Sequence, residues 1–202
     1  MAKQNIVIIK HNAGNIRSVN NALIRLNQKA EISADPDKIR KADKVIFPGV
    51  GEASTTMRYL NETGLAEVIK ELKQPTLGIC LGMQLMGSHS EEGDIPCLGI
   101  FEENIRKFVL PKSNQSNLKI PQMGWNRIFD LKSDLFDASL EGQYVYFVHS
   151  YYVAKGEHTA ATTNYLLNYS SALQRDNFFA TQFHPEKSGP VGQSIIERFL
   201  KL

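Results

Sequence analysis

One cysteine stands at a position suited to a nucleophile. Cys80 lies between two glycines in Gly78-Ile79-Cys80-Leu81-Gly82, after the apolar run Thr76–Ile79 and before a helix-like segment. Such a sharp strand-to-helix turn is the cysteine form of a nucleophile elbow, which exposes the central side chain, and flanking glycines suit its crowded backbone. The positive potential at a helix start favours the thiolate, and the Leu81 amide would face the oxyanion of a tetrahedral intermediate. Taken alone, the pattern fits equally well a buried cysteine whose glycines serve only packing.

A histidine and a carboxylate occur together later in the chain. The apolar run Phe179–Phe183 is followed by His184-Pro185-Glu186. Pro185 cannot continue a sheet ladder, so His184 falls at a strand end, where active sites of parallel sheets gather. A cysteine nucleophile needs a base that takes its proton and returns it to the leaving amine, and a carboxylate fixes the imidazole tautomer. An isolated His-Pro-Glu more often marks a surface turn, but its combination with Cys80 favours catalysis.

A second glycine-rich turn, Phe47-Pro48-Gly49-Val50-Gly51, follows another apolar run. Its glycines allow backbone amides to approach a ligand closely, although the segment lacks the lysine of a phosphate-binding Walker loop. Its simplest role is a strand-to-loop turn. If it lies near Cys80, the same segment supplies the second oxyanion donor.

The other histidines and the second cysteine have weaker claims to chemistry. His11, His89 and His158 lie among polar or turn residues and are predicted to be solvated, whereas His149 is predicted to be a core or rim histidine. Cys97 is predicted to be a packing residue. The spacing of cysteines, histidines and carboxylates matches no metal site, and neither a metal nor a cofactor is expected.

The segments that must position these groups alternate between strand and helix in the first half of the chain. Short apolar runs predict strands, and one-sided apolar spacing predicts helices. The predicted strands are Ile6–Ile9, Lys44–Phe47, Thr76–Ile79, Tyr144–Val148 and Phe179–Phe183, and the predicted helices are Ser18–Leu26, Leu65–Leu72 and Pro190–Leu202. This alternation predicts a doubly wound α/β fold, a mostly parallel sheet with helices on both faces. Residues 99–173 read as a small antiparallel extension that includes the polar loop 112–117.

Composition sets the broad class. The chain has 202 residues, 42% hydrophobic and 22% charged, with 23 basic and 21 acidic residues and a net charge of +2. These values are typical of a soluble globular protein, and no domain boundary is visible, so residues 1–202 are predicted to form a single domain. The small net charge disfavours nucleic-acid binding. No apolar run approaches the ~20 residues of a membrane span, and a secretory signal is not expected from the first residues. We therefore expect a cytoplasmic protein with two free thiols.

The segments around Cys80 and His184 together resemble class I, triad-type glutamine amidotransferases, and within them the glutaminase subunits of imidazole glycerol phosphate synthase. Four further segments carry the narrower resemblance: Gly14-Asn15-Ile16-Arg17-Ser18-Val19, Pro48-Gly49-Val50-Gly51, Met123-Gly124-Trp125-Asn126 and Tyr144-Val145-Tyr146-Phe147-Val148-His149-Ser150-Tyr151. The resemblance implies a doubly wound domain that forms a glutamyl thioester on Cys80 and hydrolyses it to glutamate. It also implies that glutamine is held by Gly51, Gln84, Ser150 and Tyr151, with the Val50 and Leu81 amides facing the oxyanion.

The same resemblance implies a partner. Ammonia would pass to a cyclase, a (β/α)8 barrel forming a heterodimer with this chain, which makes imidazole glycerol phosphate and aminoimidazole carboxamide ribonucleotide in histidine biosynthesis. Met123, Trp125, Tyr146 and Lys187 would form the interface and the ammonia gate. The chain departs from the family pattern at Gln122, where histidine is common, and at residues 10–13, which puts the details of docking and coupling in doubt.

Three other functions are compatible with parts of the sequence. A cysteine hydrolase or peptidase on a similar sheet would also need Cys80 and a histidine, but it leaves Gln84 unexplained. The same glutaminase could serve another ammonia acceptor, such as an amino-sugar synthase. A binding module that has lost activity is disfavoured because Cys80, His184 and Glu186 are all present.

Overall fold

Five parallel strands form the centre of the molecule. The computed structural model describes residues 4–12, 15–111 and 118–202. The parallel strands lie in the order β2 (Ala30–Ser33), β1 (Ile6–Ile9), β3 (Lys44–Gly49), β4 (Thr76–Cys80) and β13 (Phe178–Thr181). Because all five run in one direction, their carboxyl ends share one edge of the sheet.

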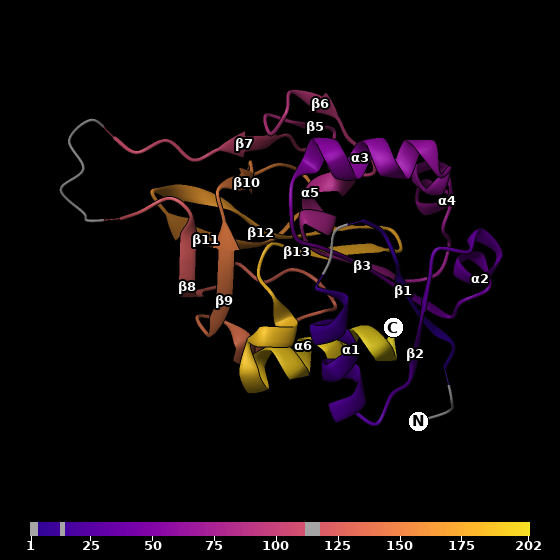
Figure 1. The fold of residues 1–202 in the computed structure, drawn as a ribbon. Helices are drawn as coiled ribbons and strands as arrows, with labels where there is room; N and C mark the ends of the chain where they lie inside the picture. The colour runs from indigo at the N-terminus through magenta and orange to yellow at the C-terminus, as the bar shows by residue number, and fades with distance from the viewer. Residues whose placement is uncertain (1–3, 13–14, 112–117) are drawn as a thin grey trace.

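The sheet continues beyond β13 with mostly antiparallel strands (Figure 1). These are, in spatial order, β12 (Leu167–Arg175), β10 (Tyr151–Val153), β7 (Ile105–Lys107), β5 (His89–Ser90) and β6 (Ile95–Pro96), with β11 (Thr159–Tyr165) also paired to β12. A separate antiparallel pair is formed by β8 (Gln122–Arg127) and β9 (Tyr144–His149). The predicted antiparallel extension is confirmed, except that β5 and β7 pair in parallel. The predicted polar loop 112–117 lies outside the described residues.

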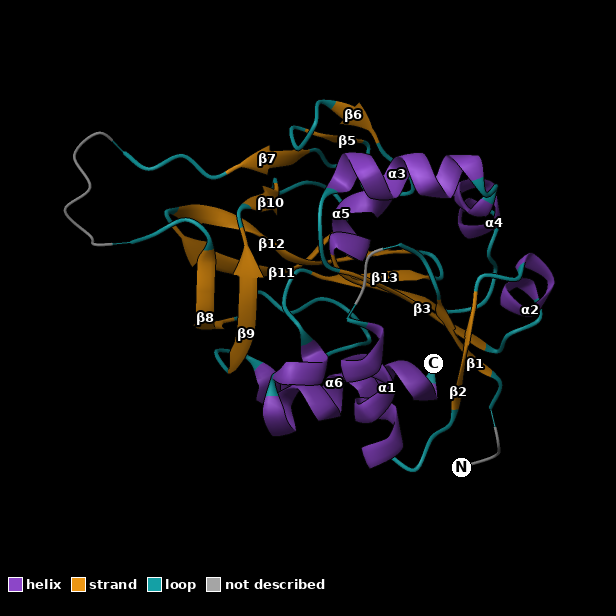
Figure 2. Ribbon diagram, viewed as in Figure 1, coloured by secondary structure: helices purple, strands orange, loops and turns teal. Residues whose placement is uncertain are grey.

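Helices cover both faces of the parallel strands (Figure 2). One face carries α1 (Ile16–Arg25) and α6 (Gly189–Lys201), and the other carries α3 (Ala53–Glu62), α4 (Leu65–Lys70) and α5 (Leu81–Met86). The remaining short helices are α2 (Pro36–Arg40) and the 3₁₀ turns η1 (Ala138–Leu140) and η2 (Pro185–Lys187). The Asp35 side chain caps α2 by accepting bonds from the amides of Asp37 and Lys38.

Strand β1 shows how the sequence encodes the two cores. Ile6 and Ile8 pack into the cluster that contains α1 and α6, whereas Val7 and Ile9 pack into the cluster that contains α3, α4 and α5. Side chains alternate between the faces of a strand, so a run of four buried apolar residues marks a sheet covered on both sides. The α/β fold predicted from the sequence is therefore confirmed. The last predicted strand ends at Thr181, two residues early.

Candidate functional site

Three neighbouring strands bring the predicted site residues together. Gly49 at the end of β3 pairs in register with Cys80 at the end of β4, and Ile79 pairs with Thr181 at the end of β13. Residues that follow these strands therefore emerge at the same sheet edge. This register places the Val50 turn and the His184 segment on either side of Cys80.

The turn at Cys80 has the geometry that the sequence predicts. Cys80 has φ 54° and ψ −109°, a conformation rarely adopted by a non-glycine residue, and α5 begins at the next residue. Such backbone strain costs about 1–3 kcal/mol and persists where the surrounding structure enforces it. Here Gly82 permits the close packing of the turn, because a Cβ atom at that position would lie 2.0 Å from the Phe47 carbonyl oxygen. The glycine therefore lets α5 begin directly against β3.

His184 and Glu186 form a buried pair. His184 Nδ1 lies 2.8 Å from Glu186 Oε1, and the two side chains are 1% and 0% exposed. Asn15 Nδ2 donates to the same carboxylate oxygen at 2.8 Å. Burial disfavours the imidazolium, but the adjacent Cys80 sulfur and the Glu186 carboxylate outweigh it and raise the pKa of His184. A carboxylate bound at Nδ1 leaves Nε2 as the atom able to exchange a proton.

The thiol of Cys80 touches two other groups. Its Sγ lies 3.9 Å from the Val148 carbonyl oxygen, to which it can donate, and accepts from Gln182 Nε2 at 3.8 Å. His184 Nε2 is buried and makes no hydrogen bond of ordinary geometry within the described part of the chain. The Val148 carbonyl oxygen is thus one acceptor open to the protonated thiol.

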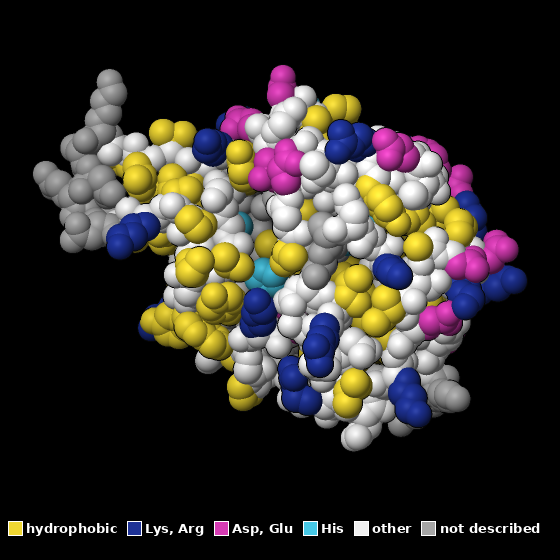
Figure 3. Space-filling model, viewed as in Figure 1, with side chains coloured by type: hydrophobic (Ala, Val, Ile, Leu, Met, Phe, Trp, Pro, Cys, Tyr) yellow, Lys and Arg dark blue, Asp and Glu magenta, His cyan; other side chains and the backbone are white. Residues whose placement is uncertain are grey.

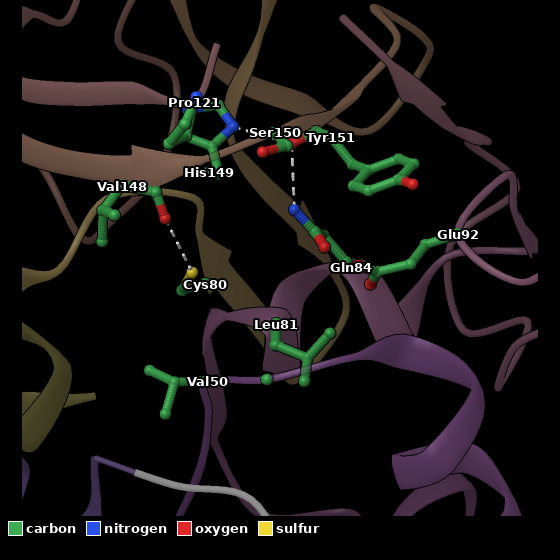
Figure 4. Close-up of a pocket in the computed structure, with 11 residues that line it drawn as sticks. Val50, Cys80, Leu81, Gln84, Glu92, Pro121, Val148, His149, Ser150 and Tyr151 are labelled. Carbon is green, nitrogen blue, oxygen red and sulfur yellow. Dashed lines mark hydrogen bonds between the residues drawn. The ribbon is translucent and has the colours of Figure 1, made fainter.

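Cys80 opens into a pocket of about 310 Å³ (Figure 4). Its lining contains Cys80 and every residue predicted to bind glutamine or the oxyanion, namely Val50, Gly51, Leu81, Gln84, Ser150 and Tyr151. The Gln84 amide is fixed by donating to the Tyr151 carbonyl oxygen at 3.0 Å. His184 and Glu186 are buried outside this lining, so only Cys80 among the predicted triad faces the pocket.

Two polar residues at the site were given no role by sequence reasoning. Glu92 lines the pocket beside Gln84, and its Oε2 accepts from the Ala53 amide at 2.8 Å. Burial raises the pKa of Glu92, although the bond from Ala53 acts in the opposite direction. Asn15, which orders the Glu186 carboxylate, lies 171 residues away in sequence. Only the family-like segment around Asn15 singled it out, because nothing local connects it to Glu186.

The predicted interface residues lie on β8, β9 and η2. Met123 and Trp125 are 66% and 56% exposed. Trp125 packs edge-on against Tyr146 at 6.1 Å between ring centroids, and Lys187 Nζ lies 5.8 Å from the Tyr146 centroid. Figure 3 shows hydrophobic side chains gathered over β8 and β9, next to a hollow and to several basic side chains. The four residues therefore form one exposed surface.

Two predictions about histidines were wrong. His11 is 7% exposed, and its Nε2 bonds the Pro48 carbonyl oxygen at 2.5 Å. His158 is largely buried against the Glu103 carboxylate, with Nδ1 3.1 Å from Oε2. Both sit in polar stretches of sequence, yet each finds a partner from a distant segment, which local composition cannot reveal. His149 is buried, as predicted, between the Tyr151 carbonyl oxygen at 2.7 Å and the Tyr169 hydroxyl at 3.3 Å.

The buried His149 should make stability depend on pH. Burial, aided by the nearby His184, outweighs the bond to Tyr151 and lowers the pKa of His149 to about 4, from 6.5. In the folded protein His149 therefore resists protonation at pH values where the same histidine in the unfolded chain accepts a proton. The contribution of neutral His149 to stability is complete above about pH 6.5 and is lost as the pH falls through about 4. Between pH 7.5 and 4.5 the unfolding free energy should fall by about 2–3 kcal/mol more in the native protein than in His149→Gln.

Urea unfolding of both proteins at the two pH values measures this difference. His89→Gln is the matched control, because it replaces a histidine whose side chain is 41% exposed rather than buried. An equal fall in the native protein and in His149→Gln would contradict the assignment to His149.

The fold and the pocket define an α/β protein of the glutamine amidotransferase class. Residues 2–202 match the family model described as glutamine amidotransferase class-I. The chain is 57% identical to the imidazole glycerol phosphate synthase subunit HisH of Bacteroides fragilis (strain YCH46), covering 98% of this chain and 99% of that protein. It is 41% identical to the HisH subunit of Escherichia coli (strain K12), covering 98% and 100%. The chain therefore belongs to the class-I glutamine amidotransferase family and, within it, to the HisH family of imidazole glycerol phosphate synthase subunits.

Solved structures agree on the fold. A crystal structure of a glutamine amidotransferase aligns with a TM-score of 0.72 at 18% identity, covering 96% of this chain and 97% of that one. PurLQS from Thermotoga maritima gives 0.72 at 16% identity, covering 98% of each chain. At these identities the likeness concerns the fold alone. Within the described residues, helices long and apolar enough to cross a membrane are absent.

Proposed function

We propose that residues 1–202 act as a single glutaminase domain that hydrolyses glutamine to glutamate and ammonia. The observation that carries the proposal is the placement of Cys80, on a strained turn at the wall of a pocket, next to the buried His184–Glu186 pair. A cysteine activated by an imidazole, which a carboxylate orients in turn, is the arrangement required for acyl transfer through a thioester.

The reaction divides into two acyl transfers on Cys80. His184 Nε2 accepts the thiol proton as Sγ attacks the side-chain amide carbon of glutamine, and the Val50 and Leu81 amides stabilise the oxyanion. His184 then donates that proton to the leaving nitrogen, which releases ammonia and forms the thioester. Water, deprotonated by His184, attacks the thioester carbon. The Cys80 thiolate leaves and takes that proton back from His184, and glutamate is the product. Glu186 holds the imidazole throughout through Nδ1.

The polar lining of the pocket suits the other end of an amino acid. Gln84 Oε1 and the Glu92 carboxylate can accept bonds from the α-ammonium group, and both side chains project into the pocket. Ser150 and Tyr151, which lie beside Gln84, together with the Gly51 backbone, complete the contacts with glutamine. Gly51 has φ 122°, a conformation that glycine adopts without the steric cost met by other residues.

The exposed surface formed by Met123, Trp125, Tyr146 and Lys187 is proposed to bind the cyclase, a (β/α)8 barrel, as a heterodimer. Exposed aromatic and methionine side chains are typical of interface centres. Because this surface adjoins the Cys80 segment through Val148 of β9, the docked barrel could receive ammonia directly, with Lys187 and Tyr146 at the gate. The partner would then make imidazole glycerol phosphate and aminoimidazole carboxamide ribonucleotide, in the cytoplasm.

Ammonia release from glutamine, measured with and without the cyclase and its nucleotide ligand, tests the proposal. The complex should release ammonia rapidly, whereas the isolated chain should be slow, because a thiol that donates to the Val148 carbonyl oxygen keeps its proton. No release in the complete mixture would overturn the glutaminase function. Equal rates with and without the cyclase would leave the glutaminase standing and refute the proposed coupling.

A further inference from the structure

Gln182 is a fully buried side-chain amide next to the nucleophile. Its side chain is 0% exposed, and it lies one residue beyond the end of β13, in the segment that leads to His184. Its Nε2 donates to Cys80 Sγ at 3.8 Å, and its Oε1 accepts from Gln84 Nε2 at 3.0 Å. Gln182 therefore joins the reacting sulfur to a wall of the glutamine pocket.

The orientation of this amide is fixed by the main chain. The Tyr151 carbonyl oxygen can only accept, so the Gln84 group 3.0 Å from it must be the NH₂ group. That same NH₂ faces Gln182, which must present its oxygen there. The remaining end of the Gln182 amide, a donor, is then directed at Cys80 Sγ. Reversing either amide would place oxygen against oxygen or NH₂ against NH₂.

We infer that Gln182 is a further catalytic residue, one that stabilises negative charge on Cys80 Sγ and holds Gln84 with its carbonyl oxygen toward the substrate. The inference deepens the proposed glutaminase function and rests on it for the role of Gln84. Hydrogen bonds to a charged acceptor are stronger than those between neutral groups, so the bond from Gln182 strengthens as the thiolate forms. The Val148 carbonyl, which also lies next to Sγ, can stabilise only the protonated thiol.

The second part of the role concerns which atom of Gln84 meets the substrate. Both hydrogens of its NH₂ group are used, by Tyr151 and Gln182, whereas Oε1 accepts no hydrogen bond from the described residues. The pocket therefore presents an acceptor, which suits an ammonium group. Without the Gln182 oxygen, the Gln84 amide could turn and present a donor instead.

Alkylation of Cys80 by iodoacetamide isolates the effect on sulfur, because it requires neither glutamine nor the partner. Rates are measured on the full chain between about pH 6 and 9 and followed on the Cys80 peptide by mass spectrometry, which separates it from Cys97. Gln182→Met removes the donor and acceptor while keeping an unbranched side chain. We expect alkylation at neutral pH to slow about fivefold and the pH profile to move to higher pH.

Gln182→Glu provides a second, nearly isosteric variant. The introduced carboxylate repels the thiolate, so alkylation should slow about tenfold or more at neutral pH. Asn177→Asp is the matched control, because Asn177 is a half-buried amide that bonds Leu72 and Gln74 at the opposite end of β13. In this variant the alkylation profile of Cys80 should stay native. In the complex, Gln182→Met should also raise the KM for glutamine about tenfold.

The outcomes separate this inference from the proposed function. A native alkylation rate and pH profile in either folded Gln182 variant, with circular dichroism confirming the fold, would overturn the charge-stabilising role. A native KM would overturn the orienting role. If the native complex releases no ammonia yet alkylation responds to Gln182, the glutaminase proposal fails and the contact with sulfur stands.

Discussion

Cys80→Ala should abolish glutamine-dependent product formation by the complex, lowering the rate by at least about 10³-fold. Alanine removes the thiol that forms the thioester, while His184 and Glu186, buried outside the pocket lining, keep their mutual bond. The substitution removes a single sulfur atom from a residue that is 7% exposed, so it leaves only a small gap. With ammonium salts supplied in place of glutamine, the partner should still form product at the native rate.

The two nitrogen sources give this prediction its control. Loss of both the glutamine-dependent and the ammonia-dependent reactions would mean that Cys80 chiefly supports docking or folding. Cys97→Ala is the matched variant, because Cys97 is a free, partly buried cysteine whose pKa burial raises to about 12. That variant should retain native glutamine-dependent activity.

Gly82→Ala should strongly destabilise the fold. The added Cβ would lie 2.0 Å from the Phe47 carbonyl oxygen, so the start of α5 and the end of β3 must separate. Because the neighbour is backbone rather than a flexible side chain, we expect the free energy of unfolding to fall by about 3 kcal/mol. The displaced segments carry Cys80 and Val50, so glutamine hydrolysis should fall even in the fraction that remains folded.

Gly64→Ala distinguishes crowding from backbone strain. Gly64 has φ 71°, but a Cβ there would meet nothing within 4 Å. Its replacement should cost only about 1 kcal/mol, the penalty of a left-handed conformation for a non-glycine residue. Urea unfolding of the two variants measures both costs, and a Gly82→Ala loss no greater than that of Gly64→Ala would refute the crowding argument.

Local sequence was sufficient for much of the architecture. The four apolar residues of β1 predict a strand covered on both faces, and the strand–glycine–cysteine–glycine pattern predicts the turn at Cys80, because both depend on neighbours in the chain. The spacing of His184 and Glu186, two residues apart across a proline, likewise predicts their hydrogen bond.

What the sequence by itself determined was therefore the fold class, the turn and the triad candidates. The tertiary structure alone decided how they are connected: the register of β3, β4 and β13, the bond from Asn15 to Glu186, and the amide chain from Tyr151 through Gln84 and Gln182 to Cys80. These contacts join segments up to 171 residues apart. No local propensity encodes which polar partners a packed core brings together, which is why His11 and His158 were misjudged as solvated and Gln182 was passed over beside Cys80.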